Sequence, residues 1–291
     1  MCRKNGFTVT EMIIVLVVIF ILYIMLGIHS DGHSSELAKR VQCGSNMRQV
    51  GLGIALYSQD YGDKYPVVGS AELAKSEKSF FGTGFYNKDG KLEYSRYVKE
   101  DFNWDQQPTV GGSLYLLIKH SGLDPKVFLC PSSEDDEMDF DDVAKEYESV
   151  NNKELEDWAQ LNDFRSMRNL SFSYNDPWHN PLTSEDSSSF VLMADKNPVF
   201  DTADGSIDKE LGLRPDINAD LEDFEEKGNS KNHDYEIQNV LFNDMHVKRH
   251  DNPNVGINED NIYTRWDGDD RLIGIWGKGI PKGKEDSYSG N

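Results

Sequence analysis

The chain opens with a long apolar run before its patterning changes to that of a folded domain. Residues Met12 to Ile28 carry no charge and are rich in Ile, Val and Leu. An apolar helix of about 20 residues spans a bilayer, and the stretch from Phe7 to Ile28 reaches that length. Glu11 is the only charged residue in this stretch, and a carboxylate at the edge of a hydrocarbon span needs a partner. We therefore expect a transmembrane helix over residues 7–28.

A second helix is predicted directly after the apolar run. Residues 29–35 are mostly polar and predict a hinge. Apolar residues then recur at steps of mostly three and four up to Tyr61, which predicts a helix with one apolar face, and Gly62 and Pro66 end it. The expected apolar positions are Leu37, Val41, Met47, Val50, Ile54 and Tyr57.

The rest of the chain, residues 67–291, predicts a globular domain with acidic insertions and a C-terminal tail. Gly111 to Gly122 has the pattern of a short amphipathic helix. Strands are expected at 170–175 and 189–195, and a hairpin at 237–249 with its turn at 243–245. A helix with one apolar face needs a sheet to cover it. These elements predict an α+β fold in which a long N-terminal helix lies on an antiparallel sheet.

The residues around the start of the apolar run resemble a known signal. Gly6-Phe-Thr-Val-Thr-Glu11 is similar to the cleavage and methylation site of type IV prepilins and type II secretion pseudopilins. The resemblance implies a leader of residues 1–6, cleavage after Gly6 by a prepilin peptidase and N-methylation of Phe7. Glu11 would then neutralise the N-terminal ammonium of a neighbouring subunit during assembly, which explains a charge in lipid. Asn5 departs from the basic residue usual before the glycine.

Three further segments resemble a group of prepilin-like proteins best known from planctomycetes. They are CGSNMRQVGLGIALYSQDYGDKYP from Cys43 to Pro66, FLCPS around Cys130, and NHDYEIQNVLFNDMHV from Asn232. The last is similar to an H-x9-D-G element, with two departures. Ten residues separate His233 from Asp244, and Met245 replaces the glycine. A methionine at positive φ costs about 1 kcal/mol or more.

Charge and compartment narrow the range of partners. The chain holds 30 Lys and Arg against 51 Asp and Glu, a formal net charge of −21, and such a surface repels nucleic acid. Arg3 and Lys4 precede the apolar run, so the positive-inside rule places the N-terminus in the cytoplasm. The expected location is the bacterial inner membrane, single-pass, with the C-terminal domain in the periplasm or on an extracellular filament.

Two cysteines, Cys43 and Cys130, would survive removal of the leader, which contains Cys2. In an oxidising compartment they could form a disulfide. The alternative is two free thiols, each packed as a small hydrophobic side chain. The sequence leaves both open.

Two sets of residues are candidate metal ligands. His233, Asp244 and His246 combine histidine and carboxylate, which suit zinc or a similar ion; the alternative is a turn closed by Asp244 with solvated histidines. Calcium is the other candidate, because major pseudopilins hold it in a C-terminal loop and acidic loops supply its oxygen ligands. Here too a solvated loop is the alternative, since the EF-hand pattern is not met. The candidate calcium ligands are Asp201, Asp204, Asp208, Asp267, Asp269 and Asp270.

The sequence contains no G-x-S-x-G, H-E-x-x-H or phosphate-loop motif, so we do not expect an enzyme. The resemblance implies a structural subunit of a type IV pilus or type II secretion-like filament, with the lipid bilayer, prepilin peptidase and other pilin-like subunits as partners. The large acidic insertions favour a minor subunit, because like-charged domains repel. Two alternatives stay open: a membrane-tethered binding module, which could depend on calcium, and a tethered hydrolase.

Overall fold

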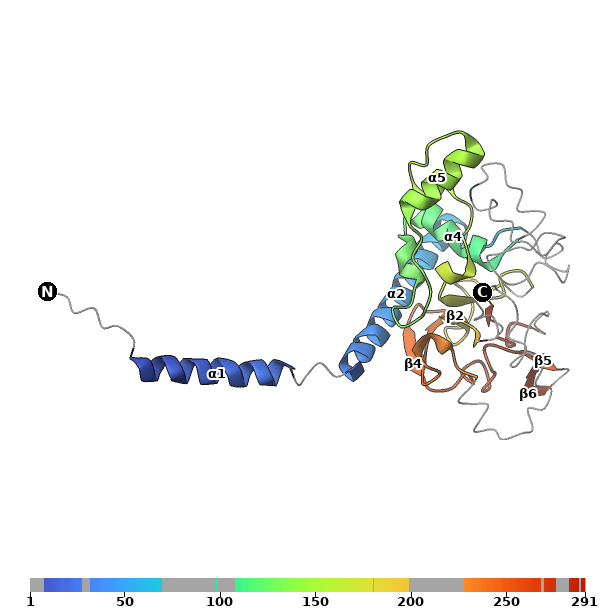
Figure 1. Cartoon of the computed structure of the whole chain (residues 1–291). Coiled ribbons are helices and arrows are strands. Elements are labelled where there is room, and N and C mark those ends of the chain that lie inside the picture. The colour runs from blue at the N-terminus through green and yellow to red at the C-terminus, as the bar shows by residue number, and fades with distance from the viewer. Residues whose placement is uncertain are drawn as a thin grey trace.

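A computed structural model of the chain describes residues 8–27, 32–69, 98, 108–179, 181–198, 228–267, 270–275, 283–287 and 289–290. Helix α1 (Val9–Gly27) lies apart from the remainder of the chain, whereas α2 (Gly32–Asp60) runs along the folded domain (Figure 1). The expected hinge overlaps residues 28–31, which lie outside the described residues.

The start of α1 is fixed by a reciprocal pair of hydrogen bonds. The Thr8 amide donates to Glu11 Oε2 at 2.7 Å, and the Glu11 amide donates to the Thr8 hydroxyl at 3.3 Å. This arrangement is a capping box, which satisfies amide groups that a helix start otherwise leaves without partners. Within the chain itself, Glu11 therefore already has a structural role.

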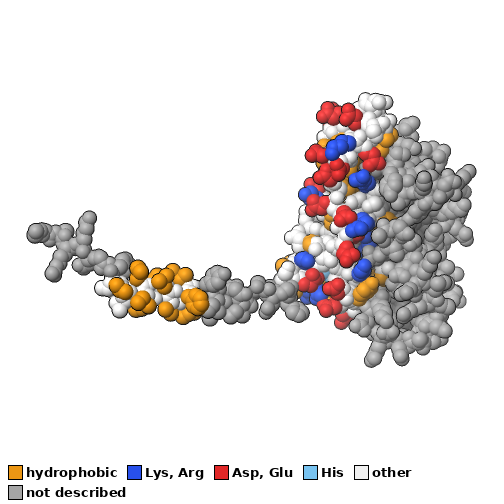
Figure 2. Space-filling view, viewed as in Figure 1, with side chains coloured by type: hydrophobic (Ala, Val, Ile, Leu, Met, Phe, Trp, Pro, Cys, Tyr) orange, Lys and Arg blue, Asp and Glu red, His pale blue; other side chains and the backbone are white. Residues whose placement is uncertain are grey.

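Apart from Thr10 and Glu11, the described side chains of α1 are apolar, and all of them are exposed. Twelve large apolar residues between Val9 and Leu22 are 48–73 % exposed, and Figure 2 shows them around the helix. Among the described residues, no helix combines the length and apolarity that crossing a membrane requires. The expected span includes Phe7 and Ile28, which lie outside the described residues, and it stays a prediction.

Helix α2 covers the core with one narrow face. Its fully buried side chains follow steps of four and three, as a helix of 3.6 residues per turn requires. The predicted face was partly wrong: Leu37 and Val41 are 55 % and 65 % exposed, and Cys43 takes their place. The two residues belong to the opposite side of the helix, about 200–240° from Cys43 at 100° per residue. The buried face is Cys43, Met47, Val50, Ile54 and Tyr57.

The sheet confirms the predicted antiparallel pairing. Its five strands have the order β4-β3-β2-β1-β7, and every neighbouring pair is antiparallel. A separate two-stranded sheet pairs β5 with β6. The four predicted strands are all present, two of them as the predicted hairpin, and their ends differ from the prediction by at most two residues. The strands are β1 (Phe172–Asn175), β2 (Val191–Asp195), β3 (Gln238–Phe242), β4 (Val247–His250), β5 (Arg265–Asp267), β6 (Asp270–Ile275) and β7 (Ser289–Gly290).

The hairpin turn between β3 and β4 contains the expected departure from ordinary backbone geometry. Met245 has φ +65°, a region in which a side chain costs about 1 kcal/mol or more. Its side chain packs against the core cluster. That burial offsets the backbone cost, which explains how a methionine occupies a position where glycine is otherwise preferred.

Two shorter helices lie in the part of the domain that the structure describes. Helix α4 (Val110–Ser121) confirms the predicted amphipathic helix, and its C-cap Gly122 has φ +65°. Helix α5 (Phe140–Asn151) lies in the acidic segment and buries only Val143 and Tyr147. Short 3-10 helices occupy Pro125–Phe128, Trp158–Gln160, Met167–Asn169 and Lys231–His233. Together with the antiparallel sheet, these helices make the fold α+β, as predicted.

Helix α2 packs closely against the domain because two of its own residues that face the domain are glycines. A Cβ at Gly51 would lie 2.9 Å from Leu241 Cδ1, and one at Gly53 would lie 2.7 Å from Leu123 Cδ1. Real Cβ atoms do not approach their neighbours so closely, so only glycine at these two positions lets the leucine side chains pack directly against the helix backbone. The G-L-G sequence thus sets the distance between α2 and the core.

We predict that Ile54→Ala lowers the free energy of unfolding by about 2–5 kcal/mol, because the side chain is fully buried and its removal leaves a cavity. Leu56→Ala is the matched control on the same helix. Leu56 is 55 % exposed, so a change within about 0.5 kcal/mol is expected. Denaturant unfolding of the full chain in detergent measures both; equal losses would contradict the assignment of the buried face.

Candidate metal centre

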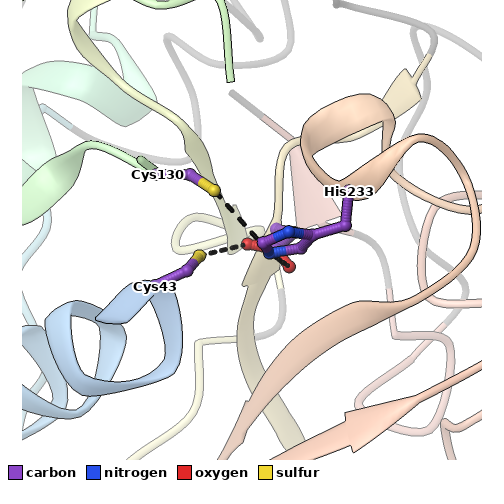
Figure 3. A group of neighbouring side chains, drawn as sticks. Cys43, Cys130 and His233 are labelled. Carbon is purple, nitrogen blue, oxygen red and sulfur yellow. Dashed lines mark hydrogen bonds and ion pairs between the residues drawn. The ribbon is translucent and has the colours of Figure 1, made fainter. Parts of the chain in front are cut away.

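Four side chains able to bind a metal ion converge at one buried point. They are Cys43, Cys130, Asp195 and His233, and one ligand atom from each lies within 4.8 Å of all the others. Figure 3 shows the two sulfur atoms and the imidazole pointing toward one another. The four residues are called the candidate metal centre below.

Three distances within the candidate metal centre are 3.6 Å or less. The Cys43 thiol donates to Asp195 Oδ1 at 3.2 Å. Cys130 Sγ and His233 Nε2 are 3.6 Å apart, and His233 Nε2 lies 3.6 Å from Asp195 Oδ2. None of the four residues is more than 3 % exposed, so the group is sealed from solvent.

The spacing Cys43-x-x-Asn46 explains how α2 meets the loop that carries Cys130. Residues three apart lie on the same face of a helix, so Asn46 faces the domain beside Cys43. Its side-chain amide donates to the Leu129 carbonyl at 2.9 Å. A single turn of α2 therefore supplies one sulfur and fixes the backbone adjacent to the other.

His233 is held by the short 3-10 helix Lys231–His233. Ser230 caps this helix, and Asp234 closes it in the left-handed region at φ +56°. The side-chain amide of Asn232 donates to the Ser171 carbonyl at 2.8 Å and to Asp195 Oδ1 at 3.2 Å. The histidine is therefore docked onto the end of the sheet.

Asp195 ends strand β2 with its side chain fully buried. Buried carboxylates require hydrogen-bond donors. The Asn239 backbone amide, on β3, donates to Asp195 Oδ2 at 2.6 Å, and Cys43 and Asn232 donate to Oδ1. Donors from three separate segments therefore converge on one carboxylate.

The second imidazole nitrogen of His233 faces another carboxylate. Nδ1 lies 3.2 Å from Glu36 Oε1. Glu36 is itself held by the Ser132 hydroxyl at 2.9 Å and by Arg40 Nε at 3.3 Å. Because carboxylate oxygens only accept, the proton on Nδ1 donates to Glu36, and this contact fixes the ring orientation.

The proximity of these groups changes their proton affinities. Burial alone disfavours the imidazolium, but contacts with Cys130, Asp195 and Glu36 outweigh it and raise the pKa of His233 to about 9. The adjacent Cys43 thiol, together with His233, lowers the pKa of Cys130 to about 7. Burial raises the pKa of Cys43 and that of Asp195. The interior thus contains several potential anions around one imidazole.

The row Cys130, His233, Glu36 has the order of a nucleophile, a base and an orienting acid. Nucleophilic catalysis needs a substrate within reach of the sulfur. Cys130 is 3 % exposed and His233 is 1 % exposed, so in this conformation a substrate has no access. Sulfur, nitrogen and oxygen donors facing one another in a closed space instead match the requirements of a metal ion.

The structure corrects the expected grouping of metal ligands. His233 joins the two cysteines and Asp195 rather than Asp244 and His246. Asp244 and His246 pair with one another on the exposed hairpin, because the turn directs them outward while the 3-10 helix directs His233 inward. Among the described residues, no other group of three or more such ligands converges.

The remaining candidate residues are placed as follows. Cys43 and Cys130 are both buried free thiols in the structure. Asp267 and Asp270 lie opposite one another in the two-stranded sheet. Gly6, Phe7, Asp201, Asp204, Asp208 and Asp269 lie outside the described residues, so the calcium and cleavage-site predictions stay predictions.

Asp195 is the member of the group that sequence reasoning missed. The signal was present, since an acidic residue directly follows the buried run FVLMA, and an acid at that position must find buried partners. No family model, curated protein or solved structure matches this chain.

We predict that Asp195→Ala lowers the free energy of unfolding by about 3–5 kcal/mol, because His233 and the amide donors lose a buried acceptor. Asp244→Ala is the control: this carboxylate is about half exposed, and a loss below about 1 kcal/mol is expected. Chemical denaturation of the full chain distinguishes the two. Similar losses for both variants would count against a central role of Asp195.

Proposed function

We propose that this protein is a pilin-like subunit that is processed by a prepilin peptidase and assembled through its N-terminal helix into a type IV pilus or type II secretion-like filament. The observation that carries the proposal is the combination of a bare apolar helix with a separately folded domain. The resemblance of residues 6–11 to the prepilin signal gives the helix its processing site.

The exposed surface of α1 supports this proposal energetically. Burying one large aliphatic or aromatic side chain contributes about 1.5–3 kcal/mol, and twelve of them are uncovered between Val9 and Leu22. Leaving such a surface in water is unfavourable, so the helix requires lipid or other apolar helices around it. The membrane would surround the helix with lipid before assembly, and a filament core would surround it with other apolar helices afterwards.

The outer side of α2 offers a continuation of the same interface. Its apolar residues lie within an arc of about 100° on the face opposite the core. They would pack against neighbouring subunits where α2 follows α1 into the filament. These residues are Leu37, Val41, Leu52 and Leu56, each 53–65 % exposed.

Charge on the domain favours a minor role. Acidic residues outnumber basic ones across the chain, and acidic side chains spread over α5 and the adjoining face in Figure 2. Closely repeated copies would repel one another at low ionic strength. An occasional copy within a filament of another subunit avoids that repulsion.

The first test is the mature N-terminus in cells that contain a prepilin peptidase. We expect mass spectrometry to find N-methylated Phe7, because cleavage after Gly6 exposes it. Gly6→Leu is the control and should leave Met1 in place. Wild-type protein retaining residues 1–6 in such cells would contradict the proposal.

The capping box allows the charge of Glu11 to be separated from its helix-starting role. Glutamine at the third helical position also accepts from the capping residue, so Glu11→Gln keeps the cap and removes the charge, whereas Glu11→Ala removes both. We expect both variants to reach the membrane and both to lose filament incorporation by at least tenfold, measured in sheared filament fractions. Wild-type incorporation of Glu11→Gln would show that capping alone is required.

A further inference from the structure

We propose that the candidate metal centre binds one zinc ion as a closed structural site, with Cys43, Cys130, Asp195 and His233 as its four ligands. The site would join α2 to the sheet, to the loop that carries Cys130 and to the 3-10 helix that carries His233. The inference is independent of the filament proposal, because it concerns the interior of the globular domain.

The spacing of the ligand atoms fits tetrahedral zinc. Zinc binds sulfur at about 2.3 Å and nitrogen or oxygen at about 2.0–2.2 Å, so the edges of the tetrahedron measure about 3.3–3.8 Å. Cys43 Sγ lies 3.2 Å from Asp195 Oδ1, and His233 Nε2 lies 3.6 Å from Cys130 Sγ and 3.6 Å from Asp195 Oδ2. All pairs lie within 4.8 Å, so an inward shift of about 1 Å closes the set on an ion.

Charge also favours a cation at this point. Zinc ligands bind as thiolate, neutral imidazole and carboxylate, and three of these four side chains become anionic in that state. The group is fully enclosed, and buried anions are stable only when paired or when they coordinate a metal. A divalent ion supplies the positive charge that a single imidazole cannot match.

The contact between His233 and Glu36 has the form expected around a bound metal. A ligating histidine donates its other ring N–H to a carboxylate or carbonyl, which fixes the tautomer. With Nδ1 donating to Glu36, 3.2 Å away, loss of the Nε2 proton on zinc binding would leave the Nε2 lone pair facing the two sulfurs and Asp195. Ser132 and Arg40 orient Glu36 in turn.

The donor set selects the class of ion and its role. Two thiolates prefer zinc over calcium or magnesium, which take oxygen ligands. Four protein ligands leave no open coordination position, as in structural rather than catalytic zinc sites. The site is therefore structural, and it links parts of the chain that are up to 190 residues apart in sequence, from Cys43 to His233.

The test uses the full chain carrying Cys2→Ser, purified in detergent with a reductant and stripped of metal by a chelator. We expect one Co²⁺ per chain, with thiolate-to-cobalt charge-transfer bands and the visible bands of tetrahedral cobalt. Stoichiometric Zn²⁺ should remove these bands. The melting temperature should rise with Zn²⁺ and fall again with chelator, a readout that needs no ligand variant to fold.

Variants locate the ion. Cys43→Ser and Cys130→Ser should each lose a large part of the charge-transfer intensity, and His233→Gln should weaken binding at least tenfold. Glu36→Gln should keep the spectrum while lowering affinity 10–100-fold, as for other residues that orient a ligand. His246→Gln is the matched histidine control on the exposed hairpin and should bind as the parent does.

Three results would overturn the proposal. The first is Co²⁺ binding without thiolate charge-transfer bands. The second is binding that His246→Gln abolishes. The third is a disulfide between Cys43 and Cys130, detected as resistance to alkylation, in protein isolated from its native compartment without reductant. The proposal would be supported if the isolated protein contained one equivalent of zinc and both thiols could be alkylated only after chelation.

Discussion

The buried carboxylate of Asp195 is the constraint on which the domain depends. A carboxylate removed from water requires donors from the protein itself, and those of Asp195 come from α2, β3 and the 3-10 helix around His233. Each donor must arrive at a fixed distance and angle. Satisfying this one side chain therefore brings the N-terminal helix and the C-terminal hairpin into register with the sheet.

The two N-terminal helices are stabilised in different ways. Helix α2 buries one side against the sheet, where Gly51 and Gly53 permit close contact, and its stability comes from tertiary packing. Helix α1 has no such partner in the described structure, and its start is secured locally by Thr8 and Glu11. An apolar helix capped by its own residues can exist before assembly, so the cap and the proposed intersubunit charge pairing act at different stages.

The sequence predicted the regular elements well because they follow local periodicity. Strands β1 to β4, the hairpin and α4 appeared where alternating or helical patterns placed them. The phase of α2 was missed at Leu37 and Val41, because several apolar stripes were compatible with its composition and only the sheet selects one. The candidate metal centre could not be predicted for a related reason: Cys43, Cys130 and His233 each lay in a recognised segment, but no local rule relates residues that are 87 to 190 positions apart.

The composition of the candidate metal centre argues against a role limited to linking two cysteines. A disulfide needs only Cys43 and Cys130, and it would leave the buried Asp195 and His233, together with the partly exposed Glu36, with no part in the link. Polar groups of this kind are costly to bury, and apolar residues of the same volume would pack at least as well. A divalent ion uses all four inner side chains as ligands and the fifth, Glu36, to orient one of them. The same residues then account for both the tie between α2 and the sheet and the polarity of the interior.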